Sequence, residues 1–395
     1  MKKIYFDNAA STPINSLVAE ETMIYMRDHY GNPSSVHSFG KGAKVLLEET
    51  RDLIAGFINC KPKEIFFTSG GTESNNFAIK GTFFRNFNSG KNHIITSSIE
   101  HSAVLETVKY LNERFGVEVT HVMPDKNGII HAEDVLKEIK ENTLLISIMH
   151  ANNEVGSLND IKAIVEGAKK HNSGKGIYVH TDTVQSMGKI KVDVKDLGVN
   201  YATLSAHKIY GPKGIGILYV SEDTQVDKFI HGGKQERNMR GGTENIPAIA
   251  GLRKAVEILK ESMNDDIAHY KSLKNKLITD VKNIYGDCVI INSPVDCNCI
   301  TNIVNMSFDW KRCKVDPDML IINLDLKGIA VSGGSACTSG SAQPSHVLRN
   351  LGHDTNTAFS SMRVSFGREN TEEEIDYLME CLKEIVQLKN EKVDA

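Results

Sequence analysis

Short strand-like runs alternate with helical patterns between about residues 60 and 220. Runs rich in β-branched and other apolar residues are typical of buried strands, and here they read EIFFTS, HIITSS, VEVTHVM, TLLISIMH, GIYVHTD, YATLSAHK and IGILYV. Between two of these runs, apolar residues recur at the spacing of one helical face, at Val104, Leu105, Val108, Leu111 and Phe115. The alternation predicts an α/β fold with a mostly parallel, doubly wound sheet and helices on both faces. Ligands in such folds bind at the carboxyl ends of the strands.

A change of pattern follows the segment GGTENIPAIAG. A long, charged helical segment from about 246 to 284 leads into CVIINS, TNIVNMSF, the helix PDMLIINLDLKG and a terminal helix from about 371. A chain of 395 residues is long enough for one large domain and one smaller domain. We therefore predict three parts, which are an N-terminal arm packing with the small domain (1–15), a large domain (16–258) and a small α+β domain (259–395).

Charge and hydropathy narrow the classes of partner. The chain has 46 basic and 50 acidic residues, a formal net charge of -4 and no long Lys/Arg run, so we expect neither a nucleic acid nor a membrane surface as partner. No apolar run approaches the roughly 20 residues of a membrane helix, and the N-terminus turns polar too early for a signal peptide. We expect a cytoplasmic protein that acts on small molecules and other proteins.

Seven cysteines are scattered along the chain. An odd, irregularly spaced set does not indicate a disulfide-bonded secreted domain, so reduced thiols are expected. Cys297 and Cys299 form a C-x-C pair, but no second pair or nearby histidine completes a metal site. We interpret them as ordinary loop or strand cysteines and predict no bound metal.

The segment EIFFTSGGTESNNFAIKG reads as a strand, a Gly-Gly-Thr turn and a helix. Glycines let backbone N–H groups approach an anion, and the N-terminus of the helix adds its dipole, so a phosphate could lie on Gly71 and Thr72. Such turns are also common for steric reasons alone.

The segment LSAHKIYGPKGIG places Ser205, His207 and Lys208 directly after a predicted strand. A partly desolvated lysine at that edge of the sheet has the lowered pKa that Schiff-base chemistry needs. The alternative is a solvated surface lysine.

Two further strand ends carry candidate groups. The run YVHTDTVQS delivers Asp182 and Gln185 from an apolar strand, and a buried carboxylate costs free energy unless it is paired. One natural partner is the protonated ring nitrogen of pyridoxal phosphate, and a helix N-cap is the alternative for Asp182. His101 follows another strand and could cap a helix, or could lie over a flat cofactor and relay protons.

The segment SGGSACTSGSAQP surrounds Cys337 with glycines and small hydroxylated residues, and a helix is expected after Pro344. This composition favours a loop that swings rather than one that packs. An inert loop thiol is the alternative for Cys337 on its own.

The segments FTSGGTESNN, EHSAV, NNEVG, DTVQS, SAHKIYGPKG, RGGTEN and SGGSACTSG, in this order, strongly resemble the NifS/IscS-type cysteine desulfurases among the fold-type I pyridoxal-phosphate enzymes. The resemblance runs from YFDNAASTP to RVSFGRENTEEEID, nearly the whole chain. It implies a large domain with a mostly parallel sheet flanked by helices, and a smaller α+β C-terminal domain that carries the mobile Cys337 loop.

The resemblance also implies roles for single residues. Lys208 would bind the cofactor covalently, Asp182 would pair with its ring nitrogen, and His101 would stack on its ring. The remaining cofactor ligands would be Gly71, Thr72, Asn153, Gln185, Ser205 and His207, with Thr243 supplied by the other subunit of a homodimer.

Arg363 and Asn153 would hold the substrate carboxylate. The role of Arg363 also has an independent physical reason, because a guanidinium binds a carboxylate with two parallel hydrogen bonds.

The implied activity is that of a homodimeric cysteine desulfurase that converts L-cysteine to L-alanine. Lys208 removes the α-proton of the substrate, and Cys337 receives the sulfur as a persulfide and passes it to an iron–sulfur scaffold or another sulfur acceptor. A selenocysteine lyase or an aminotransferase-like enzyme of the same fold is the nearest alternative, and neither requires Cys337. A binding or scaffold protein would leave Lys208, Asp182 and His101 without a role.

Overall fold

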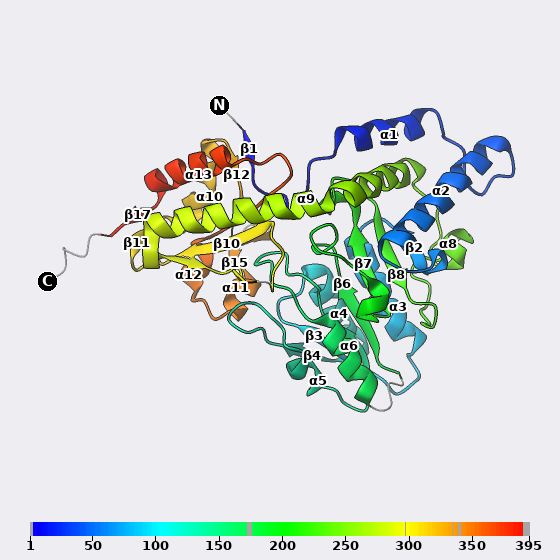
Figure 1. Cartoon of the computed structure of the whole chain (residues 1–395). Coiled ribbons are helices and arrows are strands. Elements are labelled where there is room, and N and C mark those ends of the chain that lie inside the picture. Colours follow the sequence, from blue (N-terminus) through cyan, green and yellow to red (C-terminus); the bar gives the residue numbers. More distant parts are fainter. Residues whose placement is uncertain (1–2, 172–175, 297, 334, 339–340, 390–395) are drawn as a thin grey trace.

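The computed structural model describes residues 3–171, 176–296, 298–333, 335–338 and 341–389, and for residues 335–338 and 341–342 it describes the backbone alone. Figure 1 shows a larger part built from the N-terminal and central segments and a smaller part built from the C-terminal ones. The long helix α9 (Ile246–Tyr285) runs from the larger part into the smaller one. Its bounds confirm the long helical segment predicted from about residue 246.

A seven-stranded sheet in the order β2-β8-β7-β6-β5-β3-β4 forms the centre of the larger part among the described residues. The strands are β2 (Ile65–Thr68), β3 (His93–Ser97), β4 (Glu118–Val122), β5 (Thr143–Ser147), β6 (Tyr178–Asp182), β7 (Tyr201–Ser205) and β8 (Gly216–Val220). Neighbouring strands are parallel except at β8, which pairs antiparallel with β2 and β7. The structure confirms every strand predicted in this region and the mostly parallel sheet.

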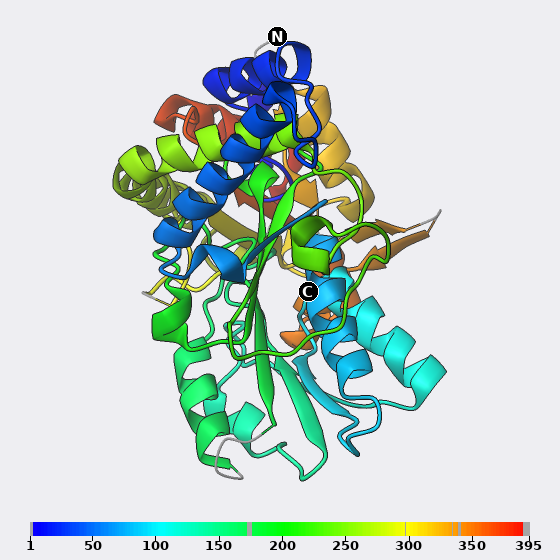
Figure 2. The same cartoon turned by 90° about the vertical axis from the view of Figure 1, so that its right-hand side faces the viewer.

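Helices cover both faces of this sheet, because successive residues of a central strand point to opposite sides. In β5, Leu145 belongs to the hydrophobic cluster of α3 and α4, whereas Ile146 belongs to the cluster of α2, α6 and the first half of α9. These helices are α2 (Ser38–Phe57), α3 (Gly71–Arg85), α4 (Ser102–Phe115) and α6 (Ile161–Lys170). The layered arrangement predicted for an α/β fold is therefore present, and Figure 2 shows it from the side.

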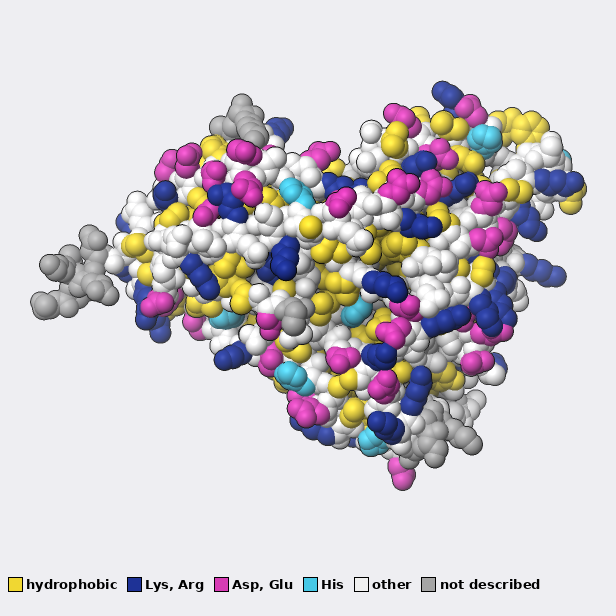
Figure 3. Space-filling model, in the orientation of Figure 1, with side chains coloured by type: hydrophobic (Ala, Val, Ile, Leu, Met, Phe, Trp, Pro, Cys, Tyr) yellow, Lys and Arg dark blue, Asp and Glu magenta, His cyan; other side chains and the backbone are white. Residues whose placement is uncertain are grey.

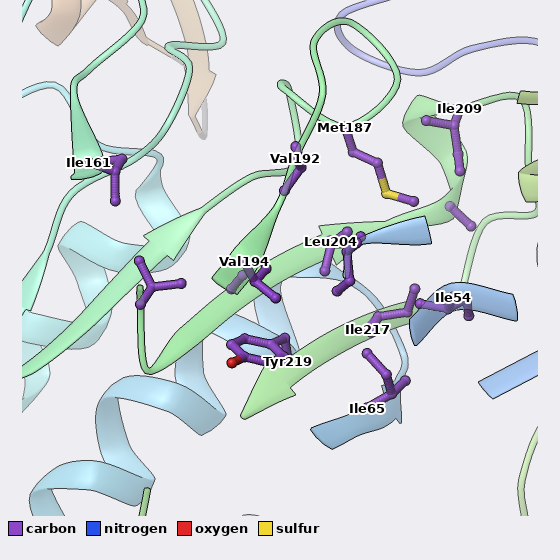
Figure 4. Close-up of a cluster of buried hydrophobic side chains, with 14 of the residues drawn as sticks. Ile54, Ile65, Ile161, Met187, Val192, Val194, Leu204, Ile209, Ile217 and Tyr219 are labelled. Carbon is purple, nitrogen blue, oxygen red and sulfur yellow. The ribbon is translucent and has the colours of Figure 1, made fainter. Parts of the chain in front are cut away.

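The cluster beneath α2 extends to the end of β7, next to Lys208. Figure 4 shows Leu204 and Ile217 of the sheet with Ile54 of α2, and Ile209 close to Met187. All five side chains are buried. Burial of each such side chain contributes about 1.5–3 kcal/mol relative to its exposure, so the chain on either side of Lys208 is held firmly.

The smaller part contains a four-stranded sheet within the described residues, in the order β13-β16-β10-β9. Its strands and covering helices are β9 (Val289–Ile291), β10 (Ile303–Phe308), β13 (Ser332–Gly333), β16 (Ser361–Ser365), α10 (Pro317–Leu326) and α13 (Glu372–Ile385). The N-terminal strand β1 (Ile4–Tyr5) pairs with β12 (Ile329–Ala330), and Phe6 joins the core of this part. The predicted boundary between residues 258 and 259 stays a prediction, since α9 crosses it without a break.

The other elements are short or peripheral. They are α1 (Ser16–Arg27), α5 (Ala132–Leu136), α7 (Val194–Leu197), α8 (Gln235–Asn238), α11 (His346–Asn350), α12 (Thr355–Phe359), β11 (Cys313–Lys314) and β17 (Gln387–Leu388), with 3-10 turns at Pro62–Glu64, Ala206–Lys208 and Gly286–Cys288. Basic and acidic side chains are interspersed over the face shown in Figure 3. In the part of the chain that the structure describes, no helix is both long and apolar enough to cross a bilayer.

The backbone of the segment around Cys337 forms an antiparallel hairpin of β14 (Ser335–Thr338) and β15 (Ser341–Pro344), seen in orange in Figure 2. Paired strands satisfy their own backbone hydrogen bonds, which residues such as serine and threonine permit. The predicted helix after Pro344 is confirmed as α11. The Cys337 side chain lies outside what the structure describes, and the mobility of this segment stays a prediction.

Candidate active site

A cavity of about 390 Å³ lies at the carboxyl ends of the central strands, where the sheet rule places ligands. The N-terminal arm, the beginnings of α3 and α4, and β16 of the smaller part contribute to its walls. The structure brings together there ten of the residues predicted from the sequence, which are Gly71, Thr72, His101, Asn153, Asp182, Gln185, Ser205, His207, Lys208 and Arg363.

Glycines shape the anion-binding end of the cavity. Gly70 has a φ of 155°, which residues with side chains rarely adopt, and Gly71 begins α3. A Cβ atom on Gly71 would lie 3.0 Å from Cγ2 of Val184. The absence of a side chain therefore lets the start of α3 lie close to Val184 in the cavity wall, and the N-terminus of a helix is a site that can bind a phosphate.

Ser205 and His207 lie beside this end of the cavity. Burial, together with the positive charges of Lys208 and Lys213, lowers the pKa of His207 to about 4. The ring is therefore neutral at physiological pH, and its Nδ1 lies 3.2 Å from Ser11 Oγ. A neutral imidazole and a hydroxyl can each donate one hydrogen bond to an anion.

Asp182 ends β6 and is buried, with 6% of its surface exposed. Its carboxylate accepts hydrogen bonds from Asn75 Nδ2 at 2.7 Å and from the Val184 N–H at 2.9 Å. Asp182 is followed by a turn and not by a helix, so the N-cap alternative is wrong. Among the described residues Asp182 forms no ion pair. A buried carboxylate without a cationic partner favours a protonated group on the ligand.

Lys208 follows β7 in a 3-10 turn, and its Nζ donates to the carbonyl groups of Ala9 at 2.5 Å and Ala10 at 2.7 Å. Burial lowers the pKa of Lys208 to about 8, and the positive charge of Arg363 adds to this effect. Asp182 and Asp7 act in the opposite direction, and Lys189 lowers the pKa slightly. The surface-lysine alternative is therefore wrong.

Arg363 comes from β16 and closes the cavity from the smaller part. It donates to Asp7 Oδ1 at 2.8 Å, to Ser332 Oγ at 2.9 Å and to the Asn153 carbonyl at 2.8 Å. Its Nε is buried and has no hydrogen-bond partner in the described part of the chain. The guanidinium is thus oriented by its neighbours and retains a donor for an anionic ligand.

His101 caps a helix and also lines the cavity. Its Nδ1 accepts from the Ala103 N–H at 3.1 Å, which makes it the N-cap of α4, and its ring also lines the cavity. Because Nδ1 accepts, the neutral ring carries its proton on Nε2. The neighbouring Glu100 is fully buried, and this burial raises its pKa to about 8.

Thr243, another predicted residue, is exposed and does not line this cavity. The Cys337 side chain lies outside the described structure. The cavity also contains residues that the sequence reasoning missed, namely Ala9, Ala10, Asn75, Met149, Ala151 and Val184. Asn75 lies one helical turn after Gly71, a spacing that could have indicated it.

The residues present fit pyridoxal phosphate. The N-terminus of α3 suits a phosphate, the unpaired buried Asp182 suits a protonated ring nitrogen, and the desolvated Lys208 suits an aldehyde. Fold and cavity together define an enzyme of the pyridoxal-phosphate-dependent class that is built on a mostly parallel sheet.

Comparisons with known proteins specify this class further. The family model for aminotransferase class-V matches residues 4–378. A cysteine desulfurase IscS of Dictyoglomus turgidum is 42% identical over 386 residues, which cover 98% of this chain and 95% of that relative. The corresponding protein of Serratia proteamaculans is 44% identical over 388 residues and covers 97% of this chain, with 92% of its own length matched.

Solved structures agree with these relatives. A NifS-like protein superposes with a TM-score of 0.89 at 38% identity, covering 97% of this chain and 99% of that one. A structure of SspA in complex with cysteine has a TM-score of 0.79 at 37% identity, covering 92% of this chain and 99% of that one. The chain therefore belongs to the aminotransferase class-V family and, within it, to the NifS/IscS-type cysteine desulfurases. Pyridoxal phosphate is the cofactor of this family.

The lowered pKa of Lys208 predicts how cofactor attachment depends on pH. Only the neutral amine attacks an aldehyde, so the attachment rate to the cofactor-free protein should rise with pH with a midpoint near pH 8, not near the 10.5 of an ordinary lysine. The measurement is the growth of cofactor absorbance across pH 6–10.

Arg363→Met should move this midpoint upward, because it removes a positive charge that lowers the pKa of Lys208. Lys213→Met should leave the midpoint in place. A wild-type midpoint close to 10.5 would contradict the environment described for Lys208.

Proposed function

We propose that this protein is an L-cysteine desulfurase that transfers the substrate sulfur to Cys337. The reaction balances as L-cysteine plus the Cys337 thiol giving L-alanine plus a Cys337 persulfide. The carbon–sulfur bond of the substrate breaks, a sulfur–sulfur bond forms, and no external oxidant or reductant is needed. The observation that carries the proposal is the single cavity that joins Lys208, Asp182 and Arg363. The cysteine desulfurase relatives, and the SspA structure with cysteine, support the choice of substrate.

Each polar group of the cavity has a task. When bound, pyridoxal phosphate supplies an electron sink for the bonds at the substrate α-carbon. Arg363, oriented by Asp7 and Ser332, would bind the substrate carboxylate together with Asn153. Lys208, with a pKa of about 8, can take the α-proton as a neutral amine and later return it.

The other side chains would hold the cofactor. Asp182 would keep a proton on the ring nitrogen, and Asn75 and the Val184 N–H fix the position of that carboxylate. Gln185 lines the cavity and donates its amide hydrogen to the Ala9 carbonyl at 2.9 Å, which fixes its side chain beside the cofactor position. His101 would stack on the ring, and Gly71, Thr72, Ser205 and His207 would bind the phosphate.

A homodimer and a sulfur acceptor belong to the same proposal. Helices α1 and α2 and their connection expose large apolar side chains that a second copy of the chain could cover, namely Leu17, Met23, Met26, Tyr30, Val36, Phe39 and Val45. Thr243 is exposed and is available to a neighbouring subunit. We propose iron–sulfur assembly as the destination of the sulfur and the cytoplasm as the location. The free thiols among the described cysteines agree with a reducing compartment.

The deciding experiment incubates the purified, yellow protein with L-cysteine under argon and measures alanine and protein-bound persulfide. We expect one alanine for each persulfide in the first turnover, and catalytic alanine release when a thiol reductant removes the persulfide. L-serine, which lacks the transferable sulfur, is the control substrate. Alanine formation without any persulfide would contradict the proposal.

A mixing experiment tests the place of Thr243. If Thr243 serves the partner's cofactor, Thr243→Ala should weaken cofactor binding about tenfold through a lost hydrogen bond. Each hybrid dimer of one Thr243→Ala chain and one Lys208→Ala chain should then contain one intact site. Its activity should reach up to half of that of a wild-type dimer. No recovery in hybrids would show that Thr243 acts in its own subunit.

A further inference from the structure

The turn that carries Lys208 contains a strained residue whose role the proposed reaction does not explain. Tyr210 has a φ of 64°, in the left-handed region that non-glycine residues rarely adopt. Its N–H donates to Thr12 Oγ1 at 2.7 Å, and its carbonyl accepts from the Asn15 N–H at 3.1 Å. The N-terminal arm therefore holds the backbone of this turn.

The side chain of Tyr210 crosses to the smaller part of the molecule. Its hydroxyl lies 3.0 Å from the Tyr270 hydroxyl of α9 and accepts from the Arg368 N–H at 2.9 Å. The Arg368 guanidinium lies 4.3 Å from the centre of the Tyr210 ring and pairs with Asp266 at 2.8 Å. Tyr210 is 8% exposed and Tyr270 is fully buried, so these contacts form in a dry interior.

This hydroxyl connects the two halves of the cavity. Tyr210 lies two residues after Lys208, and Arg368 follows β16, the strand that carries Arg363. A second buried contact supports the same turn, because Lys189 Nζ donates to the Lys208 carbonyl at 3.3 Å and lies 5.8 Å from the centre of the Tyr270 ring. The turn that carries Lys208 and the strand that carries Arg363 are thus connected by contacts outside the cavity.

We propose that Tyr210 is a positioning residue. Its hydroxyl, which contacts Tyr270 and the Arg368 N–H, fixes the position of Lys208 relative to Arg363. The strained backbone at Tyr210 is stable because Thr12 of the N-terminal arm, Tyr270 of α9 and Arg368 all form hydrogen bonds with this residue. The proposal rests on the proposed function, in which Lys208 acts on a substrate that Arg363 holds.

Tyr210→Phe tests this, because it removes the hydroxyl and keeps the ring under Arg368. We expect kcat for L-cysteine to fall about ten- to hundredfold with little change in KM, since a small misplacement of a reacting group affects the transition state most. The matched control is Tyr201→Phe. It removes another buried hydroxyl, which bonds to Thr82 at 2.8 Å in the core of the larger part. Both variants should lose similar thermal stability, and Tyr201→Phe should keep its kcat.

Tyr270→Phe provides a second variant, and the attachment rate of pyridoxal phosphate provides a second measurement. If Tyr210→Phe does not fold, Tyr270→Phe removes the same contact from the other side and should lower kcat in the same way. The attachment rate of pyridoxal phosphate to Lys208 is also expected to drop about tenfold in Tyr210→Phe but not in Tyr201→Phe.

Equal kcat values and equal attachment rates in the Tyr210→Phe and Tyr201→Phe proteins would overturn the proposal. If the wild type makes no alanine, the proposed function fails, and the attachment rates alone still decide whether Tyr210 positions Lys208.

Discussion

Lys208→Ala is expected to yield a folded but colourless protein whose alanine production is at least about a thousandfold below that of the wild type. The residue has two tasks, covalent attachment of the cofactor and proton transfer at the substrate α-carbon, and proton transfer alone is worth about 10²–10⁴ in rate. The measurements are cofactor absorbance, borohydride trapping of the cofactor–protein bond, and alanine release from L-cysteine.

Lys213→Ala is the matched control for this variant. Lys213 lies in the loop that follows this turn, is exposed and does not line the cavity, so its loss should change neither colour nor rate. The melting temperatures of both variants should also be compared. A lysine buried with a lowered pKa costs stability at neutral pH, so Lys208→Ala should not melt earlier than the wild type in the absence of cofactor. A yellow, active Lys208→Ala protein would contradict the assignment of the cofactor lysine.

Cys337→Ala and Cys337→Ser are expected to keep the yellow cofactor and the binding of L-cysteine, but to lose persulfide formation and at least about a hundredfold of the alanine rate. Without the thiolate there is no nucleophile to accept the sulfur atom. The substrate should still change the cofactor spectrum, because Lys208, Asp182 and Arg363 are intact in these variants. Spectra after mixing with L-cysteine, and persulfide counts by mass spectrometry, measure both effects.

Cys60→Ser is the matched control, since burial raises the pKa of the Cys60 thiol to about 12 and keeps it unreactive. This variant should form one persulfide per chain, as the wild type does. Alanine release by Cys337→Ala at the wild-type rate would remove Cys337 from the mechanism and would favour an enzyme that does not need this thiol, such as a selenocysteine lyase.

Much of the site could be predicted from local sequence. Strand-end residues such as Asp182, Ser205 and Lys208 follow runs whose strand character is clear, and the edge of a parallel sheet brings their side chains together whatever the rest of the chain does. The Gly71 turn is equally local, since glycine and a helix N-terminus suffice to describe it. The resemblance to the desulfurases added roles for these residues, and membership in that family is confirmed by the relatives.

Other features depended on packing. No sequence pattern predicted that the N-terminal arm would line the cavity, where the Ala9 and Ala10 carbonyls accept from Lys208. The Cys337 segment is rich in small and polar residues, which predict a loop that swings but do not predict that its backbone pairs as a hairpin. Such pairing follows from contacts between two short stretches and not from the propensity of either one.

The sequence by itself determined the alternation of strands and helices, and with it the edge of the sheet at which Asp182 and Lys208 lie, because these depend on residues close together in the chain. Only the tertiary structure decided that Arg363 enters the same cavity, that Asp7 orients it, and that the Tyr210 hydroxyl bonds to the Arg368 backbone N–H after the same strand. These contacts join segments far apart in the sequence, so they exist only once the two hydrophobic cores have packed along the two halves of α9.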